Sequence, residues 1–166
     1  MTCESFDAII VGAGQAGPAI AARCSKEGLR TAVIERGHFG GTCLNVGCVP
    51  TKTLVASARA MHLARRGAEF GFDAGEIRVD MARVKARKDG IVGKSREGLE
   101  SWMRSLKETE VIVGEARFVA AATLEVGRQR WKMPKFVAPL SLTVTDESDG
   151  ATPVHTDIDG LVSAVV

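Results

Sequence analysis

The distribution of apolar positions along the chain predicts that short buried strands alternate with helices. Residues 6–11 form an apolar run that ends at a glycine, and residues 31–35 form a second such run, each typical of a strand buried in a parallel sheet. Between them, small and apolar residues from Gln15 to about Glu27 favour a helix that packs closely on the sheet and ends at Gly28. This order of elements predicts a βαβ unit.

Two longer helical patterns follow the first unit. Apolar residues at three- and four-residue steps predict an amphipathic helix from Thr51 to about Arg66, which ends at Gly67. A second helix is expected from its N-cap, Asp80, to Lys107. Its basic face has no interleaved aromatic residues, which indicates a solvated surface rather than a nucleic-acid site.

Short β segments complete the pattern. Residues 111–113 are expected to add a third strand to the sheet, and residues 117–120 and 123–126 to form a small meander. The predicted fold class is therefore α/β, a Rossmann-like domain with a parallel sheet, long helices and a small β-meander. We assign residues 1–130 to this domain and residues 131–166 to a divergent tail whose composition is compatible with disorder.

Composition narrows the class of protein. The chain has 166 residues, of which 45% are hydrophobic and 25% charged, and a formal net charge of +2, as in ordinary soluble globular domains. Because it contains no basic block, neither nucleic acid nor a membrane surface is expected as a partner. No apolar run approaches the ~18 residues of a membrane span, and the N-terminus does not resemble a signal peptide, so a cytoplasmic location is expected.

A glycine-rich turn after the first predicted strand carries the first candidate site. Gly12, Gly14 and Gly17 have the spacing of dinucleotide-binding turns, in which the first glycine permits a tight turn, the second lets a pyrophosphate approach and the third lets helix and strand touch. Glu35 follows at about the 20-residue distance where an acid binds the adenosine ribose. An ordinary glycine turn and a surface carboxylate are the alternatives, but the flanking strand and helix favour nucleotide binding.

Two cysteines lie in a loop directly before the second predicted helix. Pro50 suits a first helical turn and biases Val49 toward extended geometry, so Cys48 is expected just ahead of the helix N-terminus, where a thiolate is favoured. Gly47 makes the loop supple enough to bring the sulfur of Cys43 to that of Cys48. The spacing leaves a redox dithiol, structural thiols and a metal site open, but no second closely spaced ligand pair is found, and no metal site is predicted.

The glycine turn followed by GGTCLNVGCVPTK at residues 40–52 resembles the FAD-dependent pyridine nucleotide–disulfide oxidoreductases. This family includes dihydrolipoamide dehydrogenase, glutathione reductase and mercuric reductase. Residues 1–126 look most like the mercuric reductase-like branch. The resemblance covers only the N-terminal FAD-binding segment and is expected to stop beyond Gly127, so the chain looks truncated relative to the family.

The resemblance implies roles for single residues. Cys48 would be the flavin-facing thiol, Cys43 the interchange thiol that attacks the substrate, and Lys52, one helical turn after Cys48, a lysine near the flavin N5. The other residues implied to bind FAD are Gly12, Gly14, Gly17, Glu35, Gly41, Thr42 and Ala116.

The resemblance also implies a reaction. Electrons would pass from NAD(P)H through FAD to the Cys43/Cys48 dithiol and then to a small-molecule acceptor, a disulfide or Hg(II). The alternative is a non-catalytic fragment that binds FAD or another nucleotide. Family members are homodimers, but neither an NAD(P)-binding nor a dimerisation domain is recognised in the sequence, so the 166-residue chain alone is expected to be inactive.

Overall fold

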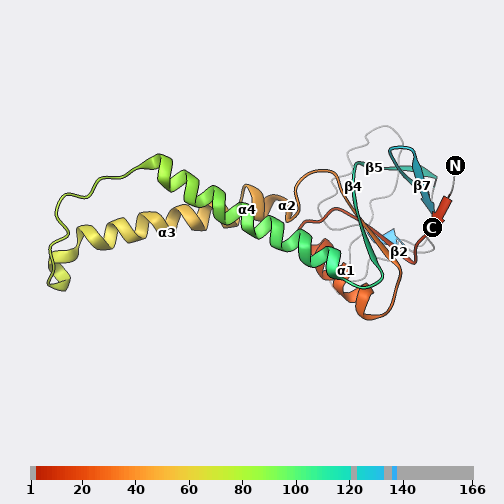
Figure 1. Cartoon of the computed structure of the whole chain (residues 1–166), viewed down its shortest axis with the longest axis horizontal. Coiled ribbons are helices and arrows are strands. Elements are labelled where there is room, and N and C mark those ends of the chain that lie inside the picture. Colours follow the sequence, from red (N-terminus) through yellow and green to blue (C-terminus); the bar gives the residue numbers. More distant parts are fainter. Residues whose placement is uncertain (1–2, 121–122, 133–135, 138–166) are drawn as a thin grey trace, which may run out of the picture. The chain divides into compact units, whose positions relative to one another are not determined.

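The computed structural model describes residues 3–120, 123–132 and 136–137 (Figure 1). The chain divides into two compact units. The first, called the sheet unit, takes its described residues from Met1–Gly41 and Leu99–Val166, and the second, called the helical unit, is Thr42–Gly98.

Strands and helices alternate as predicted only in the first part of the chain, over residues 8–35, after which the helices and then the remaining strands follow in succession. The helices are α1 (Ala16–Lys26), α2 (Gly41–Asn45), α3 (Cys48–Arg65), the 3₁₀ helix η1 (Gly67–Phe70) and α4 (Met81–Ser105). The strands are β1 (Cys3–Ser5), β2 (Ala8–Val11), β3 (Thr31–Glu35), β4 (Thr109–Val113), β5 (Ala116–Ala120), β6 (Thr123–Val126), β7 (Gln129–Lys132) and β8 (Phe136–Val137).

A parallel sheet with the strand order β4-β3-β2-β8 forms the centre of the sheet unit. The carboxyl ends of its strands share one edge, where the Gly12 N–H donates to the Ile34 carbonyl oxygen at 2.7 Å. At the next strand, the Gly114 N–H donates to the Glu35 carbonyl oxygen at 2.9 Å. The predicted βαβ unit and the third strand are confirmed. Ligands of open parallel sheets bind at this kind of edge.

Both faces of the parallel sheet are buried, because successive side chains of a strand point to opposite faces. One face packs on the second sheet, and the other packs on α1 and on the last turns of α4. The first cluster contains Phe6, Ile9, Ala32, Ile34, Leu124, Val126 and Trp131. The second contains Ile10, Ala13, Ala21, Val33, Phe39 and Met103. Burial on both faces explains why β2 and β3 are continuous apolar runs rather than alternating ones.

The second sheet has the strand order β1-β7-β6-β5. Antiparallel pairing of β5, β6 and β7 confirms the predicted meander, and β1 joins it in parallel with β7. The predicted domain boundary at residue 130 falls inside β7, and β8 pairs with β2 in the parallel sheet. Residues 138–166, which make up most of the predicted tail, lie outside the described residues.

The strand predicted from residue 6 begins only at Ala8. The Asp7 carboxylate accepts a hydrogen bond from the Arg30 N–H at 2.9 Å, and the Asp7 N–H donates to the Arg30 carbonyl oxygen at 2.8 Å. Phe6 is nevertheless buried, and the Arg30 guanidinium lies 4.7 Å from the centre of its ring. The polar side chain at position 7 thus separates β1 from β2.

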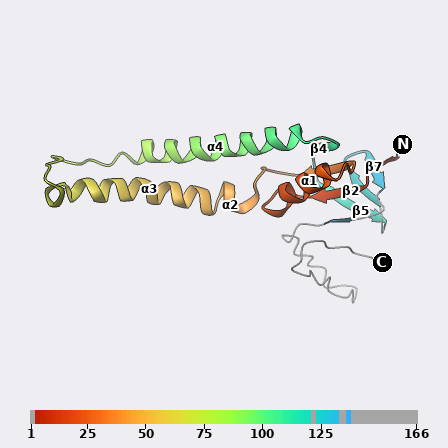
Figure 2. The same cartoon turned by 90° about the horizontal axis from the view of Figure 1, so that it is seen from below.

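The helical unit is a hairpin in which α3 and the first part of α4 run side by side in opposite directions (Figure 2). Arg87 of α4 joins the two helices, because its Nη1 donates to the Thr53 carbonyl oxygen at 3.0 Å and to Ser57 Oγ at 3.2 Å. Asp80 caps α4 as predicted, accepting a hydrogen bond from the Arg83 N–H at 3.1 Å. No helix among the described residues is long and apolar enough to cross a membrane.

Candidate functional site

The glycine turn lies at the carboxyl end of β2 in the sheet unit. Gly12 has a φ of 102°, a backbone conformation that favours glycine. A Cβ on Gly17 would lie 2.2 Å from the Gly12 carbonyl oxygen, so α1 approaches the end of β2 as closely as only a glycine permits. The tight turn and the helix–strand contact expected from the motif are both present.

Gly14 is the open position of the turn. A Cβ there would have the Gly41 Cα as its nearest neighbour, at 4.0 Å, which is ordinary van der Waals contact. Gly41 itself has a φ of 57°, and a Cβ on it would lie 2.9 Å from the Gly14 Cα. Because the Gly40 N–H also donates to the Ala13 carbonyl oxygen at 2.7 Å, the two glycine segments pack backbone against backbone. This packing leaves space beside Gly14 that a ligand can approach closely.

The Glu35 carboxylate is held against the same turn. Its Oε2 accepts a hydrogen bond from the Ala13 N–H at 2.7 Å, and its Oε1 accepts one from the Gly37 N–H at 2.7 Å. Each carboxylate oxygen can accept a further hydrogen bond. Glu35 therefore stands beside the glycines with acceptor capacity for hydroxyl groups. Ala116 opens β5 and packs against the core cluster between the sheets, and its predicted contact with adenine stays a prediction.

Together these features fit the adenosine diphosphate half of a dinucleotide such as FAD. The space beside Gly14 is one that a larger side chain would fill, and the N-terminus of α1 follows directly. A helix N-terminus with unpaired N–H groups favours a phosphate. We call Gly12, Gly14, Gly17 and Glu35 of the sheet unit the candidate nucleotide cradle.

Cys43 and Cys48 lie in the helical unit on either side of a break between α2 and α3. The N–H groups of Val46 and Gly47 both donate to the Thr42 carbonyl oxygen, at 3.0 and 2.8 Å. A Cβ on Gly47 would lie 3.0 Å from that oxygen and 3.2 Å from the Cys43 Cα. The chain therefore folds tightly back on Cys43 just before Cys48, as the expected supple loop requires.

Both cysteines are free thiols in the structure. Hydrogen bonding to Cys48 is the largest cause that raises the pKa of the Cys43 thiol, followed by its partial desolvation and by the negative charge of a Cys48 thiolate. The positive charge of Lys52 opposes this and lowers the pKa of Cys43. Lys52 therefore lies near enough for its charge to act on the Cys43 thiol. A disulfide between the two cysteines stays a prediction.

The start of α3 corrects one expectation. Val49 is helical rather than extended, and Cys48 is the first residue of the helix rather than a residue ahead of it. Pro50 is the third residue of α3, a position that tolerates proline because the first four N–H groups of a helix have no partner within it. Lys52, in the next turn, is exposed.

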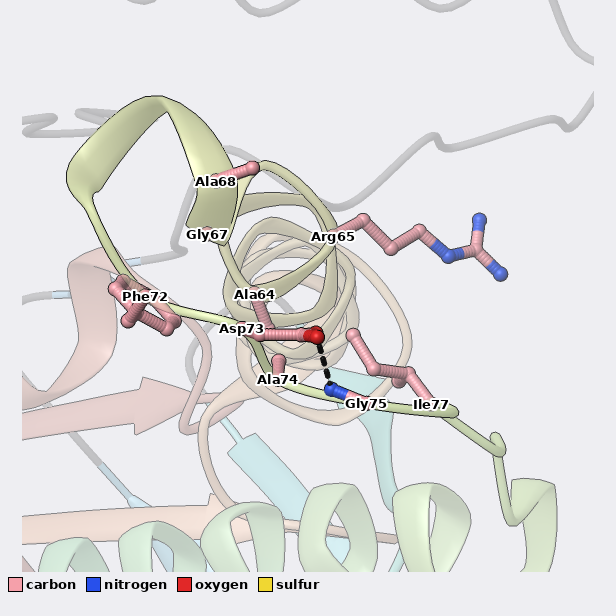
Figure 3. Close-up of a pocket in the computed structure, with 9 residues that line it drawn as sticks. All are labelled: Ala64, Arg65, Gly67, Ala68, Phe72, Asp73, Ala74, Gly75 and Ile77. Carbon is pink, nitrogen blue, oxygen red and sulfur yellow. Dashed lines mark hydrogen bonds between the residues drawn. The ribbon is translucent and has the colours of Figure 1, made fainter.

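A pocket of about 200 Å³ lies elsewhere in the helical unit, at the end of α3 (Figure 3). Asp73 folds the following turn, because its Oδ1 accepts a hydrogen bond from the Gly75 N–H at 2.8 Å. The pocket is lined by Ala64, Arg65, Gly67, Ala68, Phe72, Asp73, Ala74, Gly75 and Ile77. None of the predicted site residues is among them. Within the described residues, no group of three or more His, Cys, Asp or Glu side chains is arranged to hold a metal ion.

One contact of the segment at residues 43–48, which we call the cysteine loop, could not be predicted from the sequence. Arg96 Nε of α4 donates to Asn45 Oδ1, at the end of α2, at 3.0 Å. The two residues are 51 positions apart, so no local pattern could have joined them. The sequence indicates only that Asn45, a polar residue between the two cysteines, could form a hydrogen bond that holds the loop.

Comparison with known proteins identifies the family. Residues 6–137 match the family described as pyridine nucleotide-disulphide oxidoreductase. The chain belongs to this family. The resemblance seen in the cysteine motif and the α/β fold are thereby confirmed, but the expectation that the resemblance stops beyond Gly127 is wrong, because the family match continues through β8.

Two kinds of enzyme are among the similar relatives. The chain is 32% identical over 160 residues to a mercuric reductase of Lysinibacillus sphaericus, covering 95% of this chain and 27% of the relative. It is 36% identical over 120 residues to a dihydrolipoyl dehydrogenase of Geobacillus stearothermophilus, covering 72% of this chain and 25% of the relative. The chain thus spans about a quarter of the length of these relatives.

A solved structure of the same kind is also similar. The HOCl-induced flavoprotein disulfide reductase RclA from Escherichia coli superimposes with a TM-score of 0.67 and 31% sequence identity. The similarity covers 81% of this chain and 28% of the RclA chain. Both sequence and fold therefore relate the segment to flavoprotein disulfide reductases.

Proposed function

We propose that the chain provides the FAD-binding cradle and the redox-active dithiol of a flavin-dependent NAD(P)H oxidoreductase. The observation that carries this proposal is the pair of free thiols, Cys43 and Cys48, on either side of the tight fold at Gly47 in a chain of this family. A chain that folds back between two cysteines is the kind of arrangement in which a reversible disulfide can form.

The nucleotide cradle would hold the adenosine diphosphate half of FAD. Backbone N–H groups at the start of α1 would bind the pyrophosphate, which approaches beside Gly14. Glu35 would accept hydrogen bonds from the ribose hydroxyls while its backbone partners, Ala13 and Gly37, keep it in place. The family resemblance adds Gly41, Thr42, Lys52 and Ala116 to the FAD-binding set. The chemistry that bound FAD supplies is transfer of an electron pair from NAD(P)H to a disulfide.

The dithiol would pass that electron pair to the acceptor. Cys43, acting as the interchange thiol, attacks one sulfur of a substrate disulfide as its thiolate, and the first substrate thiol leaves with the proton that Cys43 gave up. Cys48 then attacks the Cys43 sulfur of the mixed disulfide and releases the second substrate thiol. The substrate disulfide is reduced to two thiols, and Cys43 and Cys48 are oxidised to one disulfide. Lys52 would stabilise thiolate charge during these steps.

The acceptor is proposed to be a small disulfide or Hg(II), in a mercuric reductase-like protein. Similarity to a mercuric reductase supports Hg(II), which soft thiolates bind well, and similarity to a dihydrolipoyl dehydrogenase supports a disulfide. A homodimeric assembly and a cytoplasmic location complete the proposal. The alternative is a truncated, non-catalytic fragment that binds FAD or another nucleotide without turnover.

The cofactor part of the proposal predicts that the chain binds FAD but not FMN. FMN lacks the adenosine and pyrophosphate groups that the cradle of Gly12, Gly14, Gly17 and Glu35 would hold. Each flavin would be titrated with the purified chain while flavin fluorescence is recorded, and we expect saturable quenching with FAD alone. Equal binding of FAD and FMN, or binding of neither, would show that the cradle does not recognise the adenosine half.

A further inference from the structure

Arg96 attaches the cysteine loop to α4. Its Nε donates to Asn45 Oδ1 at 3.0 Å in a partly buried hydrogen bond. Asn45 is the last residue of α2 and lies between Cys43 and Cys48 in the sequence. Asn45 therefore stands in the short segment that must keep its shape for the two sulfurs to stay close.

The loop also holds itself through its backbone. The Thr42 carbonyl oxygen accepts hydrogen bonds from the N–H groups of Val46 and Gly47, and the Thr51 N–H donates to the Gly47 carbonyl oxygen at 3.2 Å. These hydrogen bonds close the loop on residues of α2 and α3. The side chain of Arg96 connects the loop to a third helix, α4. The hydrogen bond reaches the loop at Asn45, two positions before Gly47, whose backbone is intrinsically flexible. Such a connection restrains the loop as a whole.

Arg96 acts on this loop through hydrogen bonding. Among the residues that the structure describes, no carboxylate forms an ion pair with Arg96, so Asn45 is a neutral acceptor for a guanidinium. A hydrogen bond to a charged group contributes more than one between neutral groups. The cation whose charge acts on the Cys43 thiol is Lys52. The hydrogen bond from Arg96 to the loop can therefore be tested separately from the effect of the Lys52 charge on the Cys43 thiol.

We propose that Arg96 is a positioning residue that fixes Asn45 and thereby sets the equilibrium between the Cys43/Cys48 dithiol and its disulfide. The inference rests on the proposed dithiol function. When the disulfide forms, the two thiols lose two electrons and two protons, and an oxidant such as oxidised dithiothreitol is reduced to its dithiol. Without the hydrogen bond from Arg96, the loop samples more conformations, the effective concentration of one thiol at the other falls, and the disulfide is less favoured.

The test compares Arg96→Met and Asn45→Ala with Arg87→Met in the 166-residue chain. Each protein is equilibrated in buffers of reduced and oxidised dithiothreitol, and the fraction of Cys43–Cys48 disulfide is measured after alkylation. We expect Arg96→Met and Asn45→Ala each to lower the equilibrium constant for disulfide formation about tenfold, or about 30 mV. The double variant should fall no further. Arg87→Met also removes hydrogen bonds from α4 to α3 and should leave the constant unchanged.

Two results would overturn the inference while leaving the dithiol function intact. One is an equilibrium constant equal to that of the parent in both Arg96→Met and Asn45→Ala, the second of which removes the side-chain amide that accepts the hydrogen bond. The other is an equal fall in Arg87→Met, which would indicate a general loosening of the hairpin. A parent chain that forms no Cys43–Cys48 disulfide in any buffer would instead refute the proposed function, and the inference with it.

Discussion

Replacement of Gly17 by alanine should destabilise the sheet unit severely, whereas replacement of Gly14 by alanine should leave its stability nearly unchanged. The Cβ on Gly17 would lie 2.2 Å from the Gly12 carbonyl oxygen, a backbone atom in a tight turn that cannot move alone. The Cβ on Gly14 would have its nearest neighbour at 4.0 Å. The two variants add the same methyl group only three positions apart, so their comparison isolates the steric effect.

Helix propensity and overpacking have opposite effects on the stability of Gly17→Ala, and the larger of the two decides whether the free energy of unfolding rises or falls. Alanine is favoured over glycine by about 1 kcal/mol in a helix interior, so propensity alone predicts a more stable variant. Overpacking costs about 1–3 kcal/mol when side chains can adjust, and more where backbone must shift. We expect Gly17→Ala to lower the free energy of unfolding by about 3 kcal/mol or more, and Gly14→Ala to change it by less than about 0.5 kcal/mol. Urea unfolding followed by circular dichroism measures both, and equal stability of the two variants would contradict the close contact.

Replacement of Gly14 by valine should abolish FAD binding in a chain that remains folded. The branched side chain would enter the space beside Gly41, which in our account admits the pyrophosphate. We expect at least a ~100-fold loss of affinity, which corresponds to about 2.8 kcal/mol. The measurement is a titration with FAD followed by flavin fluorescence, with circular dichroism to show that the fold is retained.

A matched control for this variant is Gly90→Val in α4. A Cβ at Gly90 meets nothing within 4 Å, so the same substitution adds the same atoms away from the cradle. FAD affinity should be unchanged in this variant. If folded Gly14→Val bound FAD as tightly as the parent does, the pyrophosphate would not approach at this turn and the cradle would be wrongly assigned.

The βαβ unit could be predicted from the sequence because its signals are local. Apolar runs buried on both faces define β2 and β3, and the glycine spacing defines the turn between β2 and α1. Asp7 shows where such a pattern fails. It lies inside an apolar run, but its hydrogen bonds with Arg30, a residue distant in sequence, separate β1 from β2. A hydrogen bond between residues so far apart in sequence does not change the local pattern of apolar and polar positions, so that pattern cannot predict it.

The helical unit shows a second limit of periodicity. The apolar stripe of α3 predicts a buried face, yet Leu54, Val55 and Leu63 are 41%, 59% and 42% exposed. The pattern indicates that a helix has an apolar face but does not identify the surface that covers it. The structure buries only Pro50 and Thr53 of this helix.

The cysteine loop was predictable in part. The folding back of the chain at Gly47 follows from the motif itself, whereas the short helix α2 was not predicted. The helical geometry of Val49 does not follow from the motif, because the preference of a residue before proline for extended backbone is weaker than the constraint of the surrounding loop. The hydrogen bond from Arg96 to Asn45 could not be predicted from the motif either, because it depends on the packing of α4 on the loop.

Cys43 and Cys48 are proposed to form a reversible redox pair, and disulfide mapping is the experiment that tests this pairing. The 166-residue chain would be oxidised, alkylated without reductant and digested, and the peptides identified by mass spectrometry. We expect a Cys43–Cys48 disulfide that disappears after treatment with a dithiol. Full alkylation of both cysteines without reductant, or a disulfide between Cys3 and Cys24 in their place, would contradict it.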